Sequence, residues 1–367
     1  MTSSDAARTF PNLSFIGWPH ITQPLRDYAR FTREVDREQR FQQIERQVYS
    51  KAEIVRTSPH DEFMLLLGKL PGWLQDACAA YEIELEEIRL DNGVPAILAM
   101  RGKEVVLPNM VDFKILTNIT TAFDGFRDDN RTGLDRTLHR ISKLPGANNS
   151  TGGVTIRIAR HVLGAADSLL PYIMHKKAIL LIGPPGVGKT TLLREVIRHL
   201  AARYGTKVVV VDTSSEVTGA GIIGHWATMP ARRIMVSDKK YQPELIRQAY
   251  ANHSPMFLAV DEIGHHGDAD AVASTVDRGV GMVATCHGTT IANVVNTPTF
   301  WPVMGAIREH GLSRQRMTEA TFDVAVEVRG VGRFMVHDRV NEAIDDVLAG
   351  REPRGIRVGN WPNLRTG

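Results

Sequence analysis

The chain has 367 residues, of which 43% are hydrophobic and 23% are charged, as in an ordinary globular protein long enough for two domains. Its formal net charge is only +3, so no overall basic field indicates a nucleic-acid partner. Cys78 and Cys286 lie far apart, which excludes a disulfide framework or a cysteine-rich zinc ribbon. We therefore expect a cytoplasmic protein with no secretory signal at its N-terminus and no apolar run long enough to cross a bilayer.

The first part of the chain predicts an extension followed by a small domain. Residues 1–57 form the N-terminal extension, in which apolar residues at three- and four-residue spacing over 25–50 predict a charged amphipathic helix. Packing against the protein itself is favoured for this helix over contact with a neighbouring subunit. Residues 58–122 alternate short helical and strand patterns, with breaks at Pro71-Gly72 and Asn92-Gly93, and predict an α+β domain.

The rest of the chain predicts a bridge, a larger domain and a tail. Residues 123–160 indicate a polar bridge, made of a polar helix, a turn rich in Gly, Asn and Ser, and a strand. Residues 161–337 alternate helices with continuous apolar runs such as "KVVVVD", which are typical of buried parallel strands. Residues 338–367 predict a helix and a flexible basic tail. The fold class is thus α/β, with a parallel sheet flanked by helices and a smaller N-terminal α+β domain.

A glycine-rich loop stands between the first of these strands and a helix. The segment "GPPGVGKTT" contains the pattern GxxxxGK[ST] in the strand–helix context that confirms a phosphate-binding loop. Its backbone N–H groups can surround an anion, and the helix adds its positive end. Lys189 would contact the β- and γ-phosphates of ATP, and Thr190 would contact Mg²⁺. The predicted nucleotide-binding residues are Gly183, Pro184, Pro185, Gly186, Val187, Gly188, Lys189, Thr190 and Thr191.

An acidic segment further along, "LAVDEIGHHGDAD", allows two interpretations: a metal centre held by protein side chains alone, or one acidic pair belonging to the nucleotide site. The adjacent His265 and His266 point apart and lack metal-ligand spacing, and Asp268 and Asp270 are placed to cap a helix, so the second interpretation is favoured. Its two members are assigned roles by their place after a buried strand: Asp261 holds the Mg²⁺ of the nucleotide, and Glu262 activates the attacking water.

Two further residues compete for catalytic roles. Glu216, in "VVVVDTSSE" after the next strand, is an alternative catalytic base to Glu262, and the sequence does not decide between them. His287, in "VATCHGTT", is placed to contact the γ-phosphate or the water as a sensor. A Cys286–His287 nucleophile pair is disfavoured because neighbouring side chains on a strand point to opposite faces.

Arginines elsewhere in the chain are candidates to stabilise charge on the transferring phosphoryl group, supplied by a neighbouring subunit. The principal candidates for this finger or sensor role are Arg140, Arg157, Arg232 and Arg233. Further candidates of the same kind are Arg160, Arg314 and Arg316.

With these motifs in view, residues 60–337 resemble the stage III sporulation protein AA group of P-loop ATPases, relatives of the type IV secretion and pilus-retraction ATPases. The resemblance depends on "DDNRTGLDRTLHRIS", "GPPGVGKTTLLREV", "VVVVDTSSE", "ARRIMV", "VDEIG" and "ATCHGTT". It implies a RecA-like core, ATP and Mg²⁺ as ligands, and rings, often hexamers, with ATP between subunits. It also implies a domain junction that contains Arg131, His139 and Arg140, and a membrane or secretion assembly as a partner.

Some longer members of this group carry a small domain for single-stranded nucleic acid, marked by an Arg-x-x-x-His motif. Arg333 and His337 match that motif by spacing alone, within a predicted hairpin, and we interpret the match as chance. The leading prediction is a Mg²⁺-dependent ATP hydrolase of the RecA-like class, an oligomeric motor that couples nucleotide state to domain movement. The alternative is an ATP-gated scaffold or single-stranded nucleic-acid-binding switch with little turnover. A small-molecule kinase is disfavoured by Glu262 and by the lack of an identifiable lid.

Overall fold

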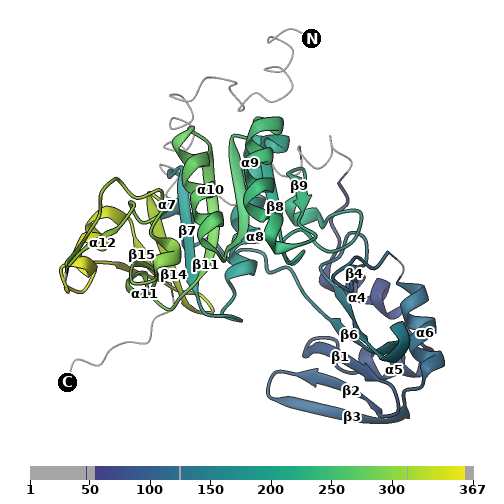
Figure 1. Ribbon diagram of the computed structural model, residues 1–367. Helices are drawn as coiled ribbons and strands as arrows, with labels where there is room; N and C mark the ends of the chain where they lie inside the picture. The colour runs from purple at the N-terminus through teal and green to yellow at the C-terminus, as the bar shows by residue number, and fades with distance from the viewer. Residues whose placement is uncertain (1–46, 48–53, 124, 312, 360–367) are drawn as a thin grey trace.

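The computed structural model describes residue 47 and residues 54–123, 125–311 and 313–359. The charged helix predicted over 25–50 lies almost wholly outside the described residues. Two sheets dominate the rest, a six-stranded one in the first half of the chain and an eight-stranded one in the second (Figure 1).

The six-stranded sheet is antiparallel and has the order β3-β2-β1-β6-β5-β4. Its strands are β1 (Leu85–Asp91), β2 (Pro95–Met100), β3 (Lys103–Met110), β4 (Arg131–Gly133), β5 (Arg140–Pro145) and β6 (Thr151–Arg157). Three helices, α4 (Pro59–Leu67), α5 (Gly72–Ala79) and α6 (Phe113–Ala122), lie against one face of this sheet. Their apolar side chains and those of the strands form one buried core, to which Phe63, Leu74, Ile88, Leu116 and Ile156 belong.

The prediction of a polar helix at the start of residues 123–160 is wrong. That region supplies β4, β5 and β6, and β6 lies in the middle of the sheet between β1 and β5. Asn130 and Arg136 adopt positive φ angles of 59° and 64°, which interrupt a helical path. In β5 the buried Ile141 stands between less buried neighbours, the period of two expected of a strand. The domain boundaries drawn on the sequence stay a prediction.

The eight-stranded sheet has the order β16-β15-β14-β7-β11-β10-β8-β9 and is parallel from β14 to β9. Its strands are β7 (Ala178–Gly183), β8 (Val208–Asp212), β9 (Arg232–Met235), β10 (Phe257–Ile263), β11 (Gly281–His287), β14 (Val324–Gly330), β15 (Arg333–His337) and β16 (Ile356–Gly359). Every residue of β7 and β8 is buried, because helices cover both faces. The predicted hairpin at Gly330–Gly332 joins β14 to β15.

Helices α7 (Leu170–Ile173) and α8 (Lys189–Tyr204) pack on one face of this sheet. The other face is covered by α9 (Gln242–His253), α10 (His266–Asp277), α11 (Ile291–Val295) and α12 (Val340–Leu348). A small hairpin joins β12 (Arg308–His310) to β13 (Ser313–Gln315). In the described part of the tail predicted as flexible, β16 pairs with β15, and Val358 joins the core beside Phe334.

Candidate nucleotide site

The glycine-rich loop connects the end of β7 to the start of α8. Gly186 and Gly188 have φ angles of 73° and 103°, a region that favours glycine. A Cβ on Gly183 would come within 2.7 Å of Val187 Cγ1, so the loop also needs its first glycine for close packing. Gly188 is the N-cap of α8 and no side chain caps it. The first N–H groups of the helix lack intrahelical partners, which suits them to an anion.

Lys189 folds over this loop. Its Nζ donates hydrogen bonds to the carbonyl oxygens of Gly183 at 2.7 Å and Pro184 at 2.9 Å, and lies 3.5 Å from His287 Nδ1. The residue is 7% exposed, and burial lowers the pKa of its ammonium group. Thr190 and Thr191 follow in the first turn of α8, and both are partly buried.

Asp261 lies near the carboxyl end of β10, beside Asp212 at the end of β8. Its Oδ2 accepts hydrogen bonds from the N–H of Ser214 at 3.0 Å and from the hydroxyl of the same residue. Burial, and then the negative charge of Asp212, raise the pKa of Asp261 to about 7, although Ser214 opposes the shift. Burial also raises the pKa of Asp212. Two buried carboxyl groups side by side form a site that a cation would stabilise.

Glu262 and His287 meet across the ends of β10 and β11. Glu262 Oε1 lies 3.3 Å from His287 Nε2, and both side chains are partly exposed, at 28% and 46%. Because the ammonium group of Lys189 is a donor only, the contact with Nδ1 favours the tautomer with its proton on Nε2, which then donates to Glu262. The backbone carbonyl of Glu262 accepts a hydrogen bond from Gln242 Nε2 at 2.7 Å.

Glu216 is held differently. Its Oε1 accepts hydrogen bonds from Arg140 at 2.6 Å and Arg157 at 3.2 Å, which come from β5 and β6 of the six-stranded sheet. Burial lowers the pKa of Arg140 despite this contact. The other two principal arginine candidates lie on the edge strand β9: Arg232 is exposed, whereas Arg233 donates to the carbonyl oxygens of Gly219, Gly221 and Ile222.

The three further arginine candidates contact other parts of the chain. Arg160 donates to the carbonyl oxygens of Glu82 and Leu85. Arg314 donates to Asn296 Oδ1, and Arg316 forms an ion pair with Asp345. Each of these side chains therefore has a structural contact within the chain.

The remaining ionisable groups of the acidic segment support the start of α10. Asp268 Oδ2 accepts hydrogen bonds from the N–H groups of Gly264 at 3.0 Å and His265 at 2.9 Å, so Asp268 caps α10 from inside its first turn, while the N-cap residue itself is His265. Asp270 pairs instead with His266 one helical turn away, at 3.0 Å. These side chains do not converge with Asp261, so the geometry of the described residues favours the nucleotide-site interpretation of the segment.

Of the two residues that match the Arg-x-x-x-His spacing, Arg333 and His337, the histidine has a structural role. His337 is 2% exposed, and its ring nitrogens contact the carbonyl oxygen of Arg354 at 2.7 Å and Glu327 Oε1 at 3.1 Å. A side chain so enclosed has no face for a nucleic acid, in agreement with the interpretation as chance.

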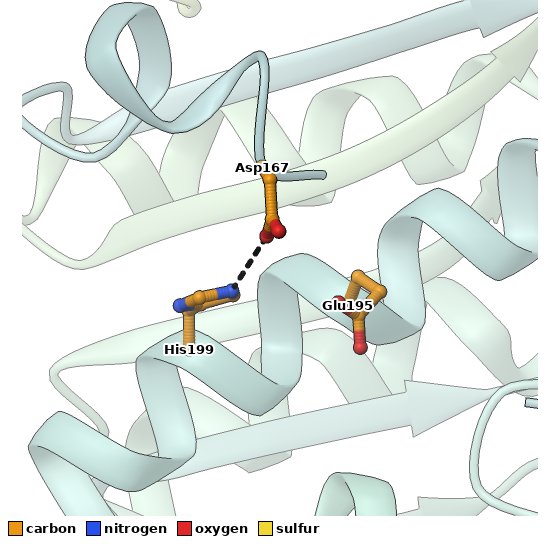
Figure 2. A group of neighbouring side chains, drawn as sticks. All are labelled: Asp167, Glu195 and His199. Atoms are coloured by element: carbon orange, nitrogen blue, oxygen red, sulfur yellow. Dashed lines mark ion pairs between the residues drawn. The ribbon is translucent and has the colours of Figure 1, made fainter. Parts of the chain in front are cut away.

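One cluster was not foreseen from the sequence. Asp167, Glu195 and His199 lie close enough to suggest a cation site, with Asp167 reaching from the segment before α7 toward α8 (Figure 2). However, Arg198 donates to both oxygens of Glu195, at 2.7 Å and 3.1 Å, and His161 Nε2 lies 2.8 Å from Oε1. The guanidinium group of Arg198 already supplies positive charge to Glu195. The buried Glu195 and His199, with the exposed Asp167, therefore form an ion network that ties α8 to the segment before α7.

Burial by itself would raise the pKa of Glu195, but the bonds from His161 and Arg198 outweigh it and lower the pKa to about 2, from an ordinary 4.5. Glu195 therefore contributes stability that is fully present above pH 4.5 and is lost as the pH falls toward 2. We expect Glu195→Gln to lower the free energy of unfolding by about 3 kcal/mol at pH 7, because Arg198 stays buried without its charge partner.

Urea denaturation at pH 7 and pH 3 checks this expectation, and the difference between variant and wild type should shrink at pH 3. Glu342→Gln, which removes an exposed ion pair with Arg339, serves as the control and should change stability little. Equal losses for the two variants at pH 7 would contradict the role given to Glu195.

Another buried contact, between Glu62 and His225, joins the two halves of the chain. Glu62 of α4 accepts a hydrogen bond from His225 Nε2 at 2.8 Å, while His225 Nδ1 accepts one from the N–H of Ala227 at 3.1 Å. These two bonds define a neutral histidine, and burial lowers its pKa. His139, predicted at a domain junction, is 1% exposed in this region, and burial lowers its pKa to about 4.

The eight-stranded sheet and the glycine-rich loop after β7 together identify the fold class of the protein. Over 76% of this chain and 86% of the other, the structure resembles that of the pilus retraction motor PilT with bound ADP, with a TM-score of 0.51 and 12% sequence identity. The protein therefore has the fold of a RecA-like P-loop ATPase, as the sequence predicts. In the part of the chain that the structure describes, every helix is too short or too polar to traverse a lipid bilayer.

Residues 148–331 match the family model described as "Sporulation stage III, protein AA", and the chain belongs to that family. It is 36% identical over 282 residues to Protein SEEDLING PLASTID DEVELOPMENT 1 of Arabidopsis thaliana, covering 73% of this chain and 41% of that protein. It is 35% identical over 309 residues to Uncharacterized protein ycf45 of Porphyra purpurea, covering 80% of this chain and 55% of that protein. The chain thus spans about half the length of these two relatives.

Proposed function

We propose that this protein binds ATP with Mg²⁺ and hydrolyses it. The observation that carries the proposal is the meeting of Lys189, His287 and Glu262 at the ends of three adjacent strands, β7, β11 and β10. His287 contacts both Lys189 and Glu262. The positive charge that would bind a terminal phosphate therefore lies near a carboxylate that can accept a proton from water.

The residues present fit the nucleotide and its metal. Residues 183–191 would hold the phosphates, and the uncapped start of α8 is the feature that favours an anion there. Thr190 and Asp261 would hold Mg²⁺, which supplies positive charge against the phosphate oxygens. A hydroxyl and a carboxylate are oxygen ligands of the kind that Mg²⁺ prefers.

Glu262 is the catalytic base in this proposal, and His287 orients it. Glu216 is disfavoured because two arginines of the six-stranded sheet already engage its carboxylate and hold it in place. Arg140, Arg157, Arg232 and Arg233 stay candidates for contact with a nucleotide held by a neighbouring subunit. We further propose a ring of identical subunits working in the cytoplasm as a motor. The match to the fold of a pilus retraction motor supports that proposal.

Phosphate release from ATP by the full chain tests the proposal directly. We expect release that stops when Mg²⁺ is chelated and resumes when it is restored, together with a rise in particle mass on addition of ATP. Absence of phosphate release at every protein concentration would overturn the proposed activity, and a constant monomer mass would overturn the ring.

A further inference from the structure

We name residues 213–218, the loop that follows β8, the coupling loop. Each of its residues is hydrogen-bonded to a residue outside the loop. On its inner side, Ser214 binds Asp261 Oδ2 twice, through its N–H at 3.0 Å and through its hydroxyl. Both bonds converge on one oxygen, so the position of Ser214 determines how the carboxylate of Asp261 is turned.

The coupling loop also reaches the second member of the acidic pair. The hydroxyl of Thr213 donates to Gln242 Oε1, and Gln242 Nε2 donates to the carbonyl oxygen of Glu262 at 2.7 Å. Thr213 and Gln242 are both buried, so this path is shielded from water. A shift of the coupling loop would therefore displace Asp261 and Glu262 together.

The outer side of the loop is held by the six-stranded sheet and by the segment that leads into β4. Arg127, just before β4, donates to Ser215 Oγ at 3.0 Å, while Arg140 and Arg157 bind the carboxylate of Glu216. Ser215 is 1% exposed and has a φ angle of 55°, a left-handed conformation that is strained for a serine. Contacts from outside the loop must maintain such a conformation, and the three arginines supply them.

The phosphate-binding helix holds the same loop from a third direction. Arg194 of α8 is 3% exposed and donates to the carbonyl oxygens of Glu216 at 2.5 Å and Val217 at 3.0 Å. The loop thus lies between the N-terminal sheet, the helix that begins at Lys189, and the two acidic residues of β10. Each of these contacts involves a different element of the protein.

We propose that the N-terminal sheet positions Asp261 and Glu262 through the coupling loop, which makes Arg127 a positioning residue for ATP hydrolysis. The inference rests on the proposed function. Arg127 acts on the loop through Ser215, its one side-chain hydrogen bond among the described residues, with Asp129 further away at 3.7 Å. It belongs to none of the groups proposed to hold the nucleotide.

Arg127→Ala tests the proposal through a split between kcat and KM. We expect kcat for ATP to fall by about fivefold, because the loop and the carboxylates behind it lose their fixed position, and KM to stay within about twofold. Arg127→Lys keeps one donor toward Ser215 and should recover at least half of the lost kcat. Arg351→Ala, which removes an exposed ion pair with Asp346, is the matched control and should leave both constants unchanged.

A double-mutant cycle separates positioning from direct contact with the nucleotide. If Arg127 acts through Ser215, Ser215→Ala should add less than about twofold to the effect of Arg127→Ala. Additive losses, a rise in KM, or no recovery in Arg127→Lys would overturn the proposal. Thermal unfolding of each variant shows whether the fold is retained, and a variant that unfolds is replaced in the cycle by Arg127→Gln.

Failure of the role proposed for Arg127 can be distinguished from failure of the proposed function. If the wild-type chain releases phosphate and Lys189→Ala abolishes that release, the ATPase proposal stands whatever Arg127 does. If the wild-type chain is active while Arg127→Ala retains full kcat, only the role of the coupling loop is lost.

Discussion

Lys189→Ala is expected to weaken ATP binding by about a hundredfold or more, because it removes from a largely buried position the charged donor that we propose contacts the phosphate oxygens. In the wild type the ammonium group is held by the carbonyl oxygens of Gly183 and Pro184, so it is already in place beside the loop. Titration of Mg-ATP in a calorimeter measures the effect.

The control for this variant is Lys176→Ala. Lys176 lies before β7, the strand that the glycine-rich loop follows, but it binds the carbonyl oxygen of Asp338, away from that loop. The Lys176→Ala variant should bind ATP as the wild type does. Equal heats for wild type and Lys189→Ala would remove the nucleotide from this loop, and with it the proposed function.

Glu262→Gln should lower turnover by about a hundredfold or more while ATP still binds, because a neutral amide cannot accept the proton of the attacking water. Glutamine has the same shape as glutamate and can keep its contact with His287, so the site should remain assembled. Single-turnover phosphate release and ATP affinity, measured on the same preparation, separate the chemical step from binding.

Glu216→Gln is the companion variant, since it tests the other carboxylate that the sequence offers as base. With two arginines on its carboxylate, it should lose less turnover than Glu262→Gln. The reverse order of losses would assign the base to Glu216 and leave His287 and Glu262 with the task of orienting the metal and water.

The sequence predicted local features well. The glycine-rich loop is a short motif whose geometry depends on its own residues, and Gly186 and Gly188 adopt the positive φ angles that such a loop needs. The buried strands β7 and β8 are continuous apolar runs, so their place in a parallel sheet covered on both faces could be expected. A capping role for Asp268 was also predicted, although α10 begins earlier than expected, at His266, and Asp268 lies in its first turn.

Contacts between distant parts of the chain could not be predicted in the same way. The pairing of Arg140 with Glu216 joins residues 76 positions apart, and no local pattern selects this glutamate over another. The strands β4 and β5 are short and polar, and their pairing with the rest of the sheet overrides the helical tendency of the segment. No pattern in the sequence distinguishes Glu195 from the other charged residues of its helix, because its burial depends on what packs against α8.

The central place of β6 in the first sheet has a consequence for how the chain can be divided. β6 is bonded to β1 on one side and β5 on the other, and it is followed directly by the segment that leads to β7. A fragment ending at residue 122 would leave one side of β1 open to association with other chains. Any separately made N-terminal half must therefore extend at least to Arg157, which also forms an ion pair with Glu216 in the second half of the chain.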